Sequence, residues 1–405
     1  MKSGICKLMV CFAVLACSNT AAAQDQQYSQ LWGKNGELWN KKRIPDFSKA
    51  GYRQGKVPIP DYPVQSTVET FGAKGDDLSD DTQAFRKAIA GCKSNTTLLI
   101  PAGRYILSDT LLIRSSRICI RGAGQGKTIL AFKKGLEQLY PDYGKEFKDQ
   151  TNWSWSGGMV LFTSNVHDSG IENLSIQFPD SVYKGHDFHE RAYNAIGFSA
   201  GAHDSWARNI QFTGADVLIW IEKTAHHITA ENWLADFGPV RAAQDISGHH
   251  ALNIYGGYNL IRAFDLKGKF VHDLSVEGEN SVYNVFSEGT GKDLAIDHHN
   301  HEQHHNLFTN LDAGIGSRLY RSGGIAVPRG ISSNETYWNI RSQKPVKYCN
   351  EFDDATAHSK NNVCVGLNTL LPSALGDQYN NWFETVAPVI LYPQDLYQAQ
   401  SAIKH

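Results

Sequence analysis

The densest group of ionisable side chains in this 405-residue sequence lies between residues 277 and 321. Five of the sixteen histidines fall within the eight residues from 298 to 305. An imidazole can take up or release a proton near neutral pH, so we predict acid–base catalysis in this segment. The candidate catalytic residues are Asp297, His298, His299, His301, His304, Tyr283, Glu277 and Glu288.

The leading interpretation of this segment is a proton-transfer site. One histidine would act as the acid or base, and Asp297 or Glu302 would orient its ring. Arg318 and Arg321 follow in the sequence, and a guanidinium group matches the geometry of a carboxylate or sulfate. We therefore assign both arginines to substrate binding.

Two other interpretations of the histidines stay open. A metal site would use His298, His299, His301 and His304 as ligands for zinc or a similar ion, but alternation along a strand sends neighbouring side chains to opposite faces. A polar stack would instead use imidazoles and amides to satisfy the backbone of turns. The sequence identifies no certain cofactor and leaves a divalent cation, calcium or zinc, open.

Several residues outside this segment could join the site. His249 and His250 would lie one or two coils earlier if the chain folds into stacked coils, and Asp236 follows an apolar strand as a carboxylate in a groove would. Trp153 and Trp155 could stack on sugar rings, although a loop that packs on the fold would use the same residues. We assign these residues to substrate binding.

Short apolar runs separated by turn residues indicate the elements that position these side chains. Leu98–Ile100, Leu111–Ile113 and Ile118–Ile120 are bounded by Pro, Gly, Ser and Asp, which is typical of short strands. A short amphipathic helix, capped by Asp80 or Asp81, is expected before them. The pattern favours an all-β fold that begins with one helix.

The central part of the chain contains imperfect repeats. Residues 166–176 and 202–212 both begin with a His-Asp-Ser turn and continue as a short alternating strand, with no periodic helix between them. Stacked coils produce this pattern, because one coil cannot bury its inner face alone. Asn173, Asn209 and Asn232 occupy matching places, which predicts a ladder of side-chain amides about 4.8 Å apart.

Four phrases near the N-terminus resemble a known family. They are Phe-Gly-Ala-Lys-Gly-Asp-Asp at 71–77, Ser-Asp-Asp-Thr-Gln-Ala-Phe at 79–85, Ile-Pro-Ala-Gly-Arg-Tyr at 100–105 and Ile-Arg-Gly-Ala-Gly-Gln-Gly-Lys-Thr at 120–128. Together they are similar to the first coils of the pectate-lyase superfamily. The resemblance implies a single-stranded right-handed parallel β-helix, or solenoid, with an N-terminal capping helix. The strand motifs that hold calcium in the best-known lyases are not legible here, so the resemblance transfers no calcium site.

The resemblance also implies a polysaccharide partner, because the superfamily contains lyases, hydrolases and non-enzymatic fibres. Our leading hypothesis is a lyase that cleaves an acidic, uronate-containing glycan by β-elimination, in which a base removes the C5 proton. The alternatives are a glycoside hydrolase with two groove carboxylates about 5 to 9.5 Å apart, and a glycan-binding solenoid without catalysis. The candidate carboxylates are Glu222, Asp236, Glu277, Glu288 and Asp297.

Four segments are expected along the chain. Residues 1–23 are predicted to be a signal peptide, 24–67 an N-terminal extension, 68–370 the parallel β-helix domain, and 371–405 a C-terminal extension that packs on the solenoid. Export to the periplasm or the extracellular space follows from the signal peptide. An alternative reading of the same segment is a lipoprotein signal that would anchor the protein through Cys17.

Four cysteines lie beyond the predicted signal peptide: Cys92, Cys119, Cys349 and Cys364. An exported protein can keep disulfides, and Cys349 and Cys364 are separated by a plausible loop, but four reduced and buried thiols fit the sequence equally well.

The charge pattern predicts no nucleic-acid partner, because the formal net charge is −2 and no basic run is present. Outside the predicted signal peptide, no segment of the sequence is apolar over a length that would cross a membrane. The oligomeric state is left open.

Overall fold

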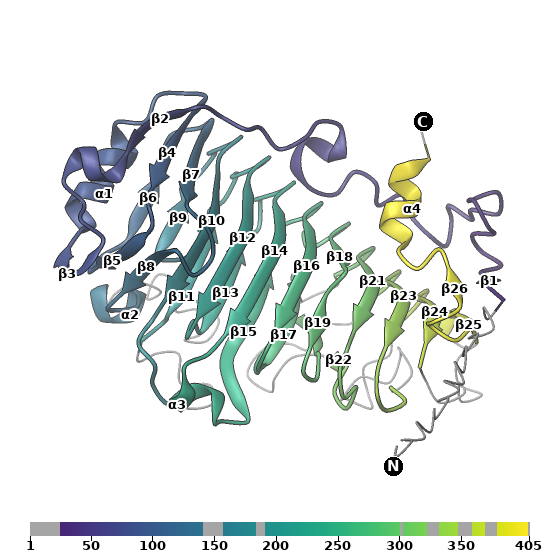
Figure 1. Cartoon of the computed structure of the whole chain (residues 1–405). Helices are drawn as coiled ribbons and strands as arrows, with labels where there is room; N and C mark the ends of the chain where they lie inside the picture. The colour runs from purple at the N-terminus through teal and green to yellow at the C-terminus, as the bar shows by residue number, and fades with distance from the viewer. Residues whose placement is uncertain are drawn as a thin grey trace, which may run out of the picture.

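The computed structural model describes residues 25–140, 157–183, 191–299, 303–321, 332–346, 359–368 and 379–403. Parallel strands stack along one axis into two long sheets, and the chain alternates between the sheets as it advances (Figure 1). This arrangement confirms the prediction of a single parallel β-helix. A helix covers the N-terminal end of the stack, also as predicted.

The larger sheet has 16 strands. Its main path consists of β2 (Val64–Thr67), β4 (Thr96–Ile100), β7 (Ile118–Gly122), β10 (Gly170–Gln177), β12 (Trp206–Thr213), β14 (Thr229–Asp236), β16 (Leu260–Leu266), β18 (Val285–Ser287), β21 (Leu307–Asp312), β23 (Thr336–Arg341), β24 (Val363–Leu367) and β25 (Trp382–Glu384). Four strands join it beside this path: β3 (Asp76–Asp80), β5 (Gly103–Leu107), β8 (Thr128–Phe132) and β19 (Thr290–Gly291).

The smaller sheet has eight strands, which we call the 8-strand sheet. In spatial order they are β6 (Leu111–Ile113), β9 (Val160–Phe162), β11 (Asn194–Phe198), β13 (Val217–Ile221), β15 (Ile246–Ile254), β17 (Lys269–Glu277), β20 (Ile296–His299) and β22 (Tyr320–Arg321). A third, two-stranded sheet joins β1 (Gln27–Tyr28) to β26 (Leu391–Tyr392).

The predicted asparagine ladder forms a corner inside the larger sheet. Asn173, Asn209 and Asn232 lie in the middle of β10, β12 and β14 and have positive φ angles of 59°, 54° and 53°, which asparagine tolerates better than most residues. The Asn209 side-chain amide donates to the Asn173 carbonyl at 2.8 Å, and the Asn232 amide donates to that of Asn209. This ladder confirms that successive coils are in register.

A second amide ladder lies at the corner that leads from the 8-strand sheet into the larger one. Asn259 donates to Asn284 at 2.9 Å, and Asn284 donates to Asn306 at 3.1 Å. In the next coil Glu335 takes the place of an asparagine and accepts from the Asn306 side chain at 3.1 Å, and Asn362 follows it. These polar groups are buried, so the ladder satisfies the backbone of the turns from within.

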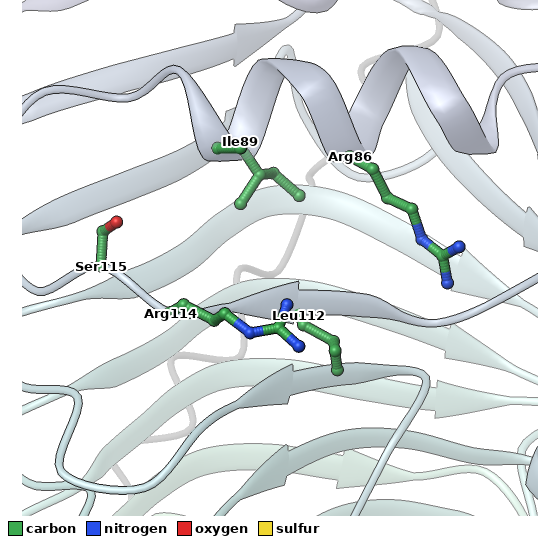
Figure 2. Close-up of a pocket in the computed structure, with 6 residues that line it drawn as sticks. Arg86, Ile89, Leu112, Arg114 and Ser115 are labelled. Carbon is green, nitrogen blue, oxygen red and sulfur yellow. The ribbon is translucent and has the colours of Figure 1, made fainter.

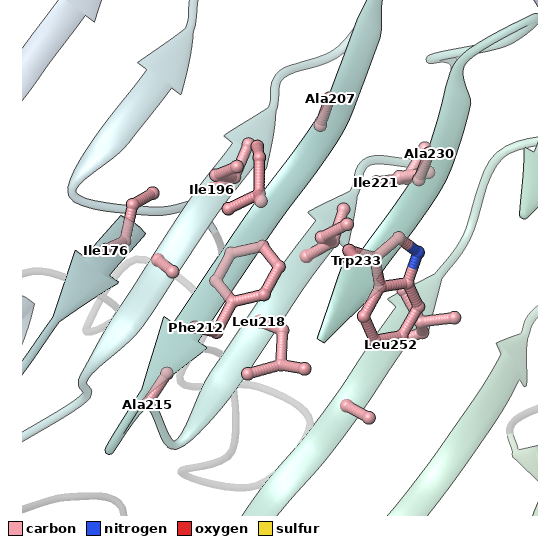
Figure 3. Close-up of a cluster of buried hydrophobic side chains, with 14 of the residues drawn as sticks. Ile176, Ile196, Ala207, Phe212, Ala215, Leu218, Ile221, Ala230, Trp233 and Leu252 are labelled. Atoms are coloured by element: carbon pink, nitrogen blue, oxygen red, sulfur yellow. The ribbon is translucent and has the colours of Figure 1, made fainter. Parts of the chain in front are cut away.

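Apolar side chains fill the interior of the coils. Ile176, Phe212 and Leu252 come from three different strands and belong to one buried cluster that extends over successive coils (Figure 3). Aromatic rings stack from coil to coil, as between Phe162 and Phe198 with centroids 4.7 Å apart. Because each coil covers the next, the core runs along the stack as one continuous cluster.

The capping helix α1 (Thr82–Ala90) buries Phe85, Ala88 and Ile89. Asp81 occupies its N-cap position but accepts from the Lys74 amide at 2.8 Å, whereas Asp80 accepts from the Thr82 amide at 2.9 Å. The other helices are short: α2 (Leu136–Leu139), α3 (Pro239–Ala242), α4 (Leu396–Ala402) and two 3₁₀ turns, Tyr52–Gly55 and Val68–Phe71.

The N-terminal segment runs along the stack from the end that carries α4 and β26 to the end that carries α1 (Figure 1). Hydrogen bonds hold it on the stack: Gln400 of α4 accepts from the Phe47 amide at 2.8 Å, and the Arg53 guanidinium pairs with Asp168 just before β10. Tyr397 of α4 also donates to the Ala50 carbonyl at 3.2 Å. The described parts of both extensions therefore pack on the solenoid and on each other.

Cys364 is disulfide-bonded, and its partner lies outside the described residues. Cys92 and Cys119 carry free thiols, and burial raises the pKa of the Cys92 thiol to about 11. Among the residues that the structure describes, no helix has both the length and the apolar character needed to cross a membrane.

Candidate functional site

The outer face of the 8-strand sheet carries a row of polar residues. Pairing of β13, β15, β17 and β20 places Ile219, Leu252, Leu274 and Ile296 in one row, and all four belong to the core. The residues that follow them point to the opposite face, because side chains alternate along a strand. That outer row consists of Trp220, Asn253, Ser275 and Asp297, with Arg321 in β22.

A β-bulge at the start of β15 adds two adjacent histidines to this face. The backbone amides of His249 and His250 both donate to the Asp216 carbonyl, at 2.8 and 3.1 Å, which leaves one extra residue in β15. The strand pairing shifts register in the same region, between Ile246 and Gly248. The bulge lets neighbouring side chains lie on the same side, which strict alternation would forbid.

Three imidazoles from two coils meet beside the bulge. The ring centroids of His250 and His272 are 4.9 Å apart, and that of His249 is 4.2 Å from His250 and 5.5 Å from His272. His250 Nδ1 lies 2.8 Å from the Ser275 hydroxyl, and His272 Nδ1 lies 3.0 Å from Asp297 Oδ2. All five side chains are buried. We call His249, His250 and His272 the imidazole cluster.

Two carboxylates and a phenol continue the outer face at the ends of the same strands. Glu222, Tyr255 and Glu277 follow Ile221, Ile254 and Val276, which pair with one another across β13, β15 and β17. Tyr255 lies beside Glu277 at the ends of adjacent strands, and burial followed by the charge of Glu277 raises the pKa of Tyr255 well above its ordinary value. The phenol therefore keeps its proton.

Glu222, Tyr255 and Arg321 are partly exposed on this outer face, whereas Glu277 is buried. The Trp220 indole donates to Glu222 at 3.0 Å, and its ring lies 5.6 Å from that of Tyr255. A ligand can therefore reach the polar face across Glu222 and Tyr255, next to an aromatic surface suited to a sugar ring.

The structure brings part of the predicted site together. Asp297, Glu277 and His250, with His249, lie on one outer face, and Arg321 is paired with Asp297 across β20 and β22. Asp297 contacts a histidine ring, as the proton-transfer interpretation expected, but that ring is His272 of the preceding coil.

His298 lies in the core instead. It continues the inward row of Ile221, Ile254 and Val276, is fully buried, and packs edge-on against Phe308. Burial lowers the pKa of His298 to about 4, so the ring is neutral near pH 7. Its Nε2 atom is 3.8 Å from Glu335 of the amide ladder.

The pair of His298 and Glu335 predicts how stability varies with pH. Burial raises the pKa of Glu335 from 4.5 to about 8, so between these values the folded protein holds a proton that the unfolded chain releases. This contribution to stability is complete below pH 4.5 and is lost as the pH rises through 8. His298 acts in the opposite sense between pH 4 and 6.5, and Tyr337 beside Glu335 stays neutral throughout.

From pH 6.5 to 8 we therefore expect the free energy of unfolding in urea to fall more steeply for the wild type than for Glu335→Gln, whose side chain does not titrate. Equal slopes for the two proteins in this window would contradict the assigned protonation of Glu335.

Tyr283 and His304 belong to the corner between the sheets. Tyr283 stacks between Tyr258 and His305 at 4.9 and 5.4 Å, and Phe47 of the N-terminal segment packs nearby. His304 Nδ1 is 2.7 Å from His305 Nδ1. These rings form a stack along the corner that the N-terminal segment partly covers, away from the imidazole cluster.

Three further predicted residues have structural partners elsewhere. Glu288 lies at the asparagine corner and accepts from Gln398 of α4 at 2.8 Å. Asp236 ends β14 in the larger sheet and accepts from the Phe237 amide at 2.8 Å. The Arg318 guanidinium donates to the buried Asp273 at 2.6 Å and to three backbone carbonyls, so it holds two coils together.

Some predicted residues cannot be placed. His301, Trp153 and Trp155 lie outside the described residues, as do Cys17 and the predicted signal peptide. The backbone of His299 pairs with Glu277, but its side chain is not among those described.

A separate cavity of about 380 Å³ lies at the N-terminal cap, between α1 and β6. Figure 2 shows Arg86 and Ile89 of the helix facing Leu112 and Arg114. The Arg86 guanidinium forms an ion pair with Asp109 at 2.8 Å and donates a hydrogen bond to the Thr110 carbonyl. This cavity contains none of the residues of the imidazole cluster.

Sequence reasoning missed His272, Ser275, Asn253 and Tyr255. The sequence Val-His-Asp-Leu-Ser-Val at 271–276 is similar to the His-Asp repeats, whose histidines lie at the corner of the coils. The corner stack of His167, His203 and His226 does exist, with centroids 5.1 Å apart. His272 differs from the corner histidines in its pairing with His250 of β15, and this pairing follows from the strand register in the structure.

Comparison with known proteins supports the fold assignment. Residues 66–185 match the family described as "Rhamnogalacturonase A/epimerase, pectate lyase-like". A probable rhamnogalacturonase B of Aspergillus fumigatus is 24% identical over 253 residues, which cover 52% of this chain and 48% of that protein.

Two proteins of Azotobacter vinelandii are also similar. Mannuronan C5-epimerase AlgE5 is 29% identical over 168 residues, covering 34% of this chain and 17% of the epimerase. Alginate lyase 7 is 36% identical over 121 residues, covering 28% and 12%. The chain thus spans less than half the length of each of these relatives. Together with the stacked parallel coils, the matches support a pectate-lyase-like superfamily for this chain.

Proposed function

We propose that this protein is a polysaccharide-degrading enzyme that cleaves an acidic, uronate-containing glycan by β-elimination. The observation that carries the proposal is that Tyr255 and Glu277 lie side by side at the ends of adjacent strands, on the outer face of the sheet whose strands also carry the imidazole cluster. β-Elimination requires a base, a proton donor and groups that stabilise the negative charge of the substrate. The similarity to an alginate lyase and to a C5-epimerase supports a uronate substrate, since both reactions begin with removal of the C5 proton.

Glu277 and Tyr255 suit the two proton transfers. Glu277 would accept the proton from C5 as the C5–H bond breaks, a double bond would form between C4 and C5, and the bond from C4 to the glycosidic oxygen would break. Tyr255 would donate its proton to the leaving oxygen, and the proton on Glu277 would then pass to the phenolate of the neighbouring Tyr255. Because the two groups lie on adjacent strands, they would act from the same side of the sugar ring.

The imidazole cluster lies in the coils that also carry Tyr255 and Glu277, on the same face. The cluster lies further along the same strands, so a uronate polymer bound over Glu277 would extend along this face toward the imidazole groups. Arg321, in the strand beside Asp297, is the described arginine of the outer row that could contact a neighbouring sugar.

Hydrolysis is the second candidate, because Glu222 and Glu277 lie on the same row with one strand between them. A strand spacing of about 4.8 Å puts their Cα atoms about 9.6 Å apart, close to the separation of carboxyl groups in inverting glycosidases. A neutral glycan cleaved with inversion would use these two residues.

One assay distinguishes β-elimination from hydrolysis. The protein is incubated with a panel of acidic and neutral polysaccharides, while ultraviolet absorbance of an unsaturated uronate and new reducing ends are followed together. We expect both signals to rise with an acidic glycan and neither with a neutral one. Reducing ends without the absorbance would indicate hydrolysis, and neither signal across the panel would favour a glycan-binding solenoid.

Export of the protein is part of the proposal. The disulfide at Cys364 supports it, since such bonds persist in oxidising compartments. Fractionation of the producing cells, with detection of the processed N-terminus, would test export and would separate cleavage after residue 23 from acylation of Cys17.

A further inference from the structure

We infer that the imidazole cluster is a metal site that binds a zinc-type divalent ion through His249, His250 and His272. One ring nitrogen from each histidine lies within 4.8 Å of the others. In a tetrahedral site with Zn–N bonds of 2.0–2.1 Å, ligand nitrogens are about 3.3 Å apart, so small side-chain rotations bring the three rings onto one ion. The role given to this ion below rests on the proposed function.

The local backbone supports this convergence. The bulge on the Asp216 carbonyl turns His249 and His250 to one side of β15, and parallel pairing brings His272 beside them. Asp216 is itself held by Arg241, whose guanidinium is fully buried and donates to it at 2.8 Å. The ligands therefore come from packed strands with a fixed register.

The groups around the cluster match the surroundings of a metal site. A ligating histidine usually donates its other ring N–H to a carboxylate or another acceptor, which fixes the ring. His272 Nδ1 faces Asp297 at 3.0 Å, and His250 Nδ1 faces Ser275 at 2.8 Å. Coordination through Nε2 would keep both contacts. Three imidazole ligands also suit zinc better than calcium, which prefers oxygen.

The excess of carboxyl groups over cationic side chains on the outer face indicates a function for the ion. The outer face carries the carboxyl groups of Glu222, Glu277 and Asp297, and an acidic substrate would add another. The described strands of the 8-strand sheet carry two cationic side chains, of which Lys269 pairs with Asp245 at 2.5 Å and Arg321 lies at the edge beside Asp297. A divalent ion on the imidazole cluster would supply positive charge for the uronate carboxylate and would stabilise the enolate that forms when the C5 proton leaves.

The other histidine stack provides a matched control. His167, His203 and His226 lie 5.1 Å apart, ring to ring, along the corner of the coils. These rings come one from each coil without a bulge, and they are not brought together around one point. Loss of His203 should therefore leave metal binding unchanged.

The test measures Zn²⁺ directly. The purified full chain is stripped with a chelator and titrated with Zn²⁺ by calorimetry, and its metal content is measured before and after. We expect one ion per chain, binding at least 100-fold weaker in His250→Ala/His272→Ala, about 10- to 100-fold weaker in Asp297→Asn, and unchanged in His203→Ala. Circular dichroism of each variant shows that it is folded.

Absence of a stoichiometric Zn²⁺ site in the wild type, or undiminished binding in the folded double variant, would overturn the inference. Asp297→Asn leaves all three ligands in place and covers the case in which the double variant does not fold. Stripped protein that cleaves a uronate glycan at the full rate would remove the metal from the reaction but leave the proposed function intact. Tight Zn²⁺ binding with no cleavage of any glycan would leave the metal site intact and would remove the proposed function.

Discussion

Replacing Glu277 by glutamine is expected to lower the rate of β-elimination by about 10²- to 10⁴-fold, because the amide cannot accept the C5 proton. The amide has nearly the same shape as the carboxylate, so the fold should persist. The rate is measured as the ultraviolet absorbance of the unsaturated product at saturating glycan. Binding of the glycan should change much less than the rate.

Glu279 provides a control two residues away. Its side chain is exposed and pairs with Lys223 on the surface at 3.3 Å. Glu279→Gln should retain the wild-type rate. A Glu277→Gln enzyme that keeps more than half of the wild-type rate would remove Glu277 from the proton transfer.

The largest expected effect on stability comes from Arg241. Its guanidinium and the Asp216 carboxylate are both buried and form a 2.8 Å ion pair, so Arg241→Met would leave an uncompensated charge in the interior. Loss of one partner of such a pair typically costs about 3–5 kcal/mol in the free energy of unfolding. Guanidinium denaturation of the two proteins would measure the difference.

The same substitution should weaken Zn²⁺ binding, because the Asp216 carbonyl holds the bulge at His249 and His250. Lys223→Met is the matched control, since Lys223 and Glu279 are exposed and their pair contributes little. A loss of stability for Arg241→Met no larger than that for Lys223→Met would contradict the structural role of the buried pair.

The architecture could be predicted from sequence because its signals are local. Short apolar runs, turn residues and the repeated asparagines report on one coil at a time, and each coil contacts only its neighbours. Asn173 and Asn209 could be matched by eye, and they are hydrogen-bonded to each other. The capping helix followed from Phe85, Ala88 and Ile89 in the same way.

The site could be predicted only in part, because it depends on which face each residue occupies. His298 and Asp297 are adjacent, and one step along β20 separates a core residue from an outer one. The sequence does not determine which of these two residues faces the core. Asp297 was expected to orient a histidine of its own segment, but the parallel pairing puts His272 of the preceding coil in that place.

The bulge is the second feature that pattern reasoning could not supply. Alternation argued against neighbouring histidines as joint ligands, and this holds for a regular strand. His249 and His250 escape the rule because two backbone amides share the Asp216 carbonyl. The sequence Gly-His-His alone does not predict the bulge, since the bulge depends on Asp216 in the preceding coil and on Arg241, which binds Asp216.

A crystal structure of Glu277→Gln with a bound uronate oligosaccharide would show directly where the substrate binds. We expect a sugar ring over Tyr255 and residue 277, with C5 nearest the substituted side chain and the carboxylate directed toward His250 and His272. An oligosaccharide bound at full occupancy elsewhere, such as the cavity beside Arg86 and Arg114, with no sugar on the outer face of the 8-strand sheet, would contradict this expectation.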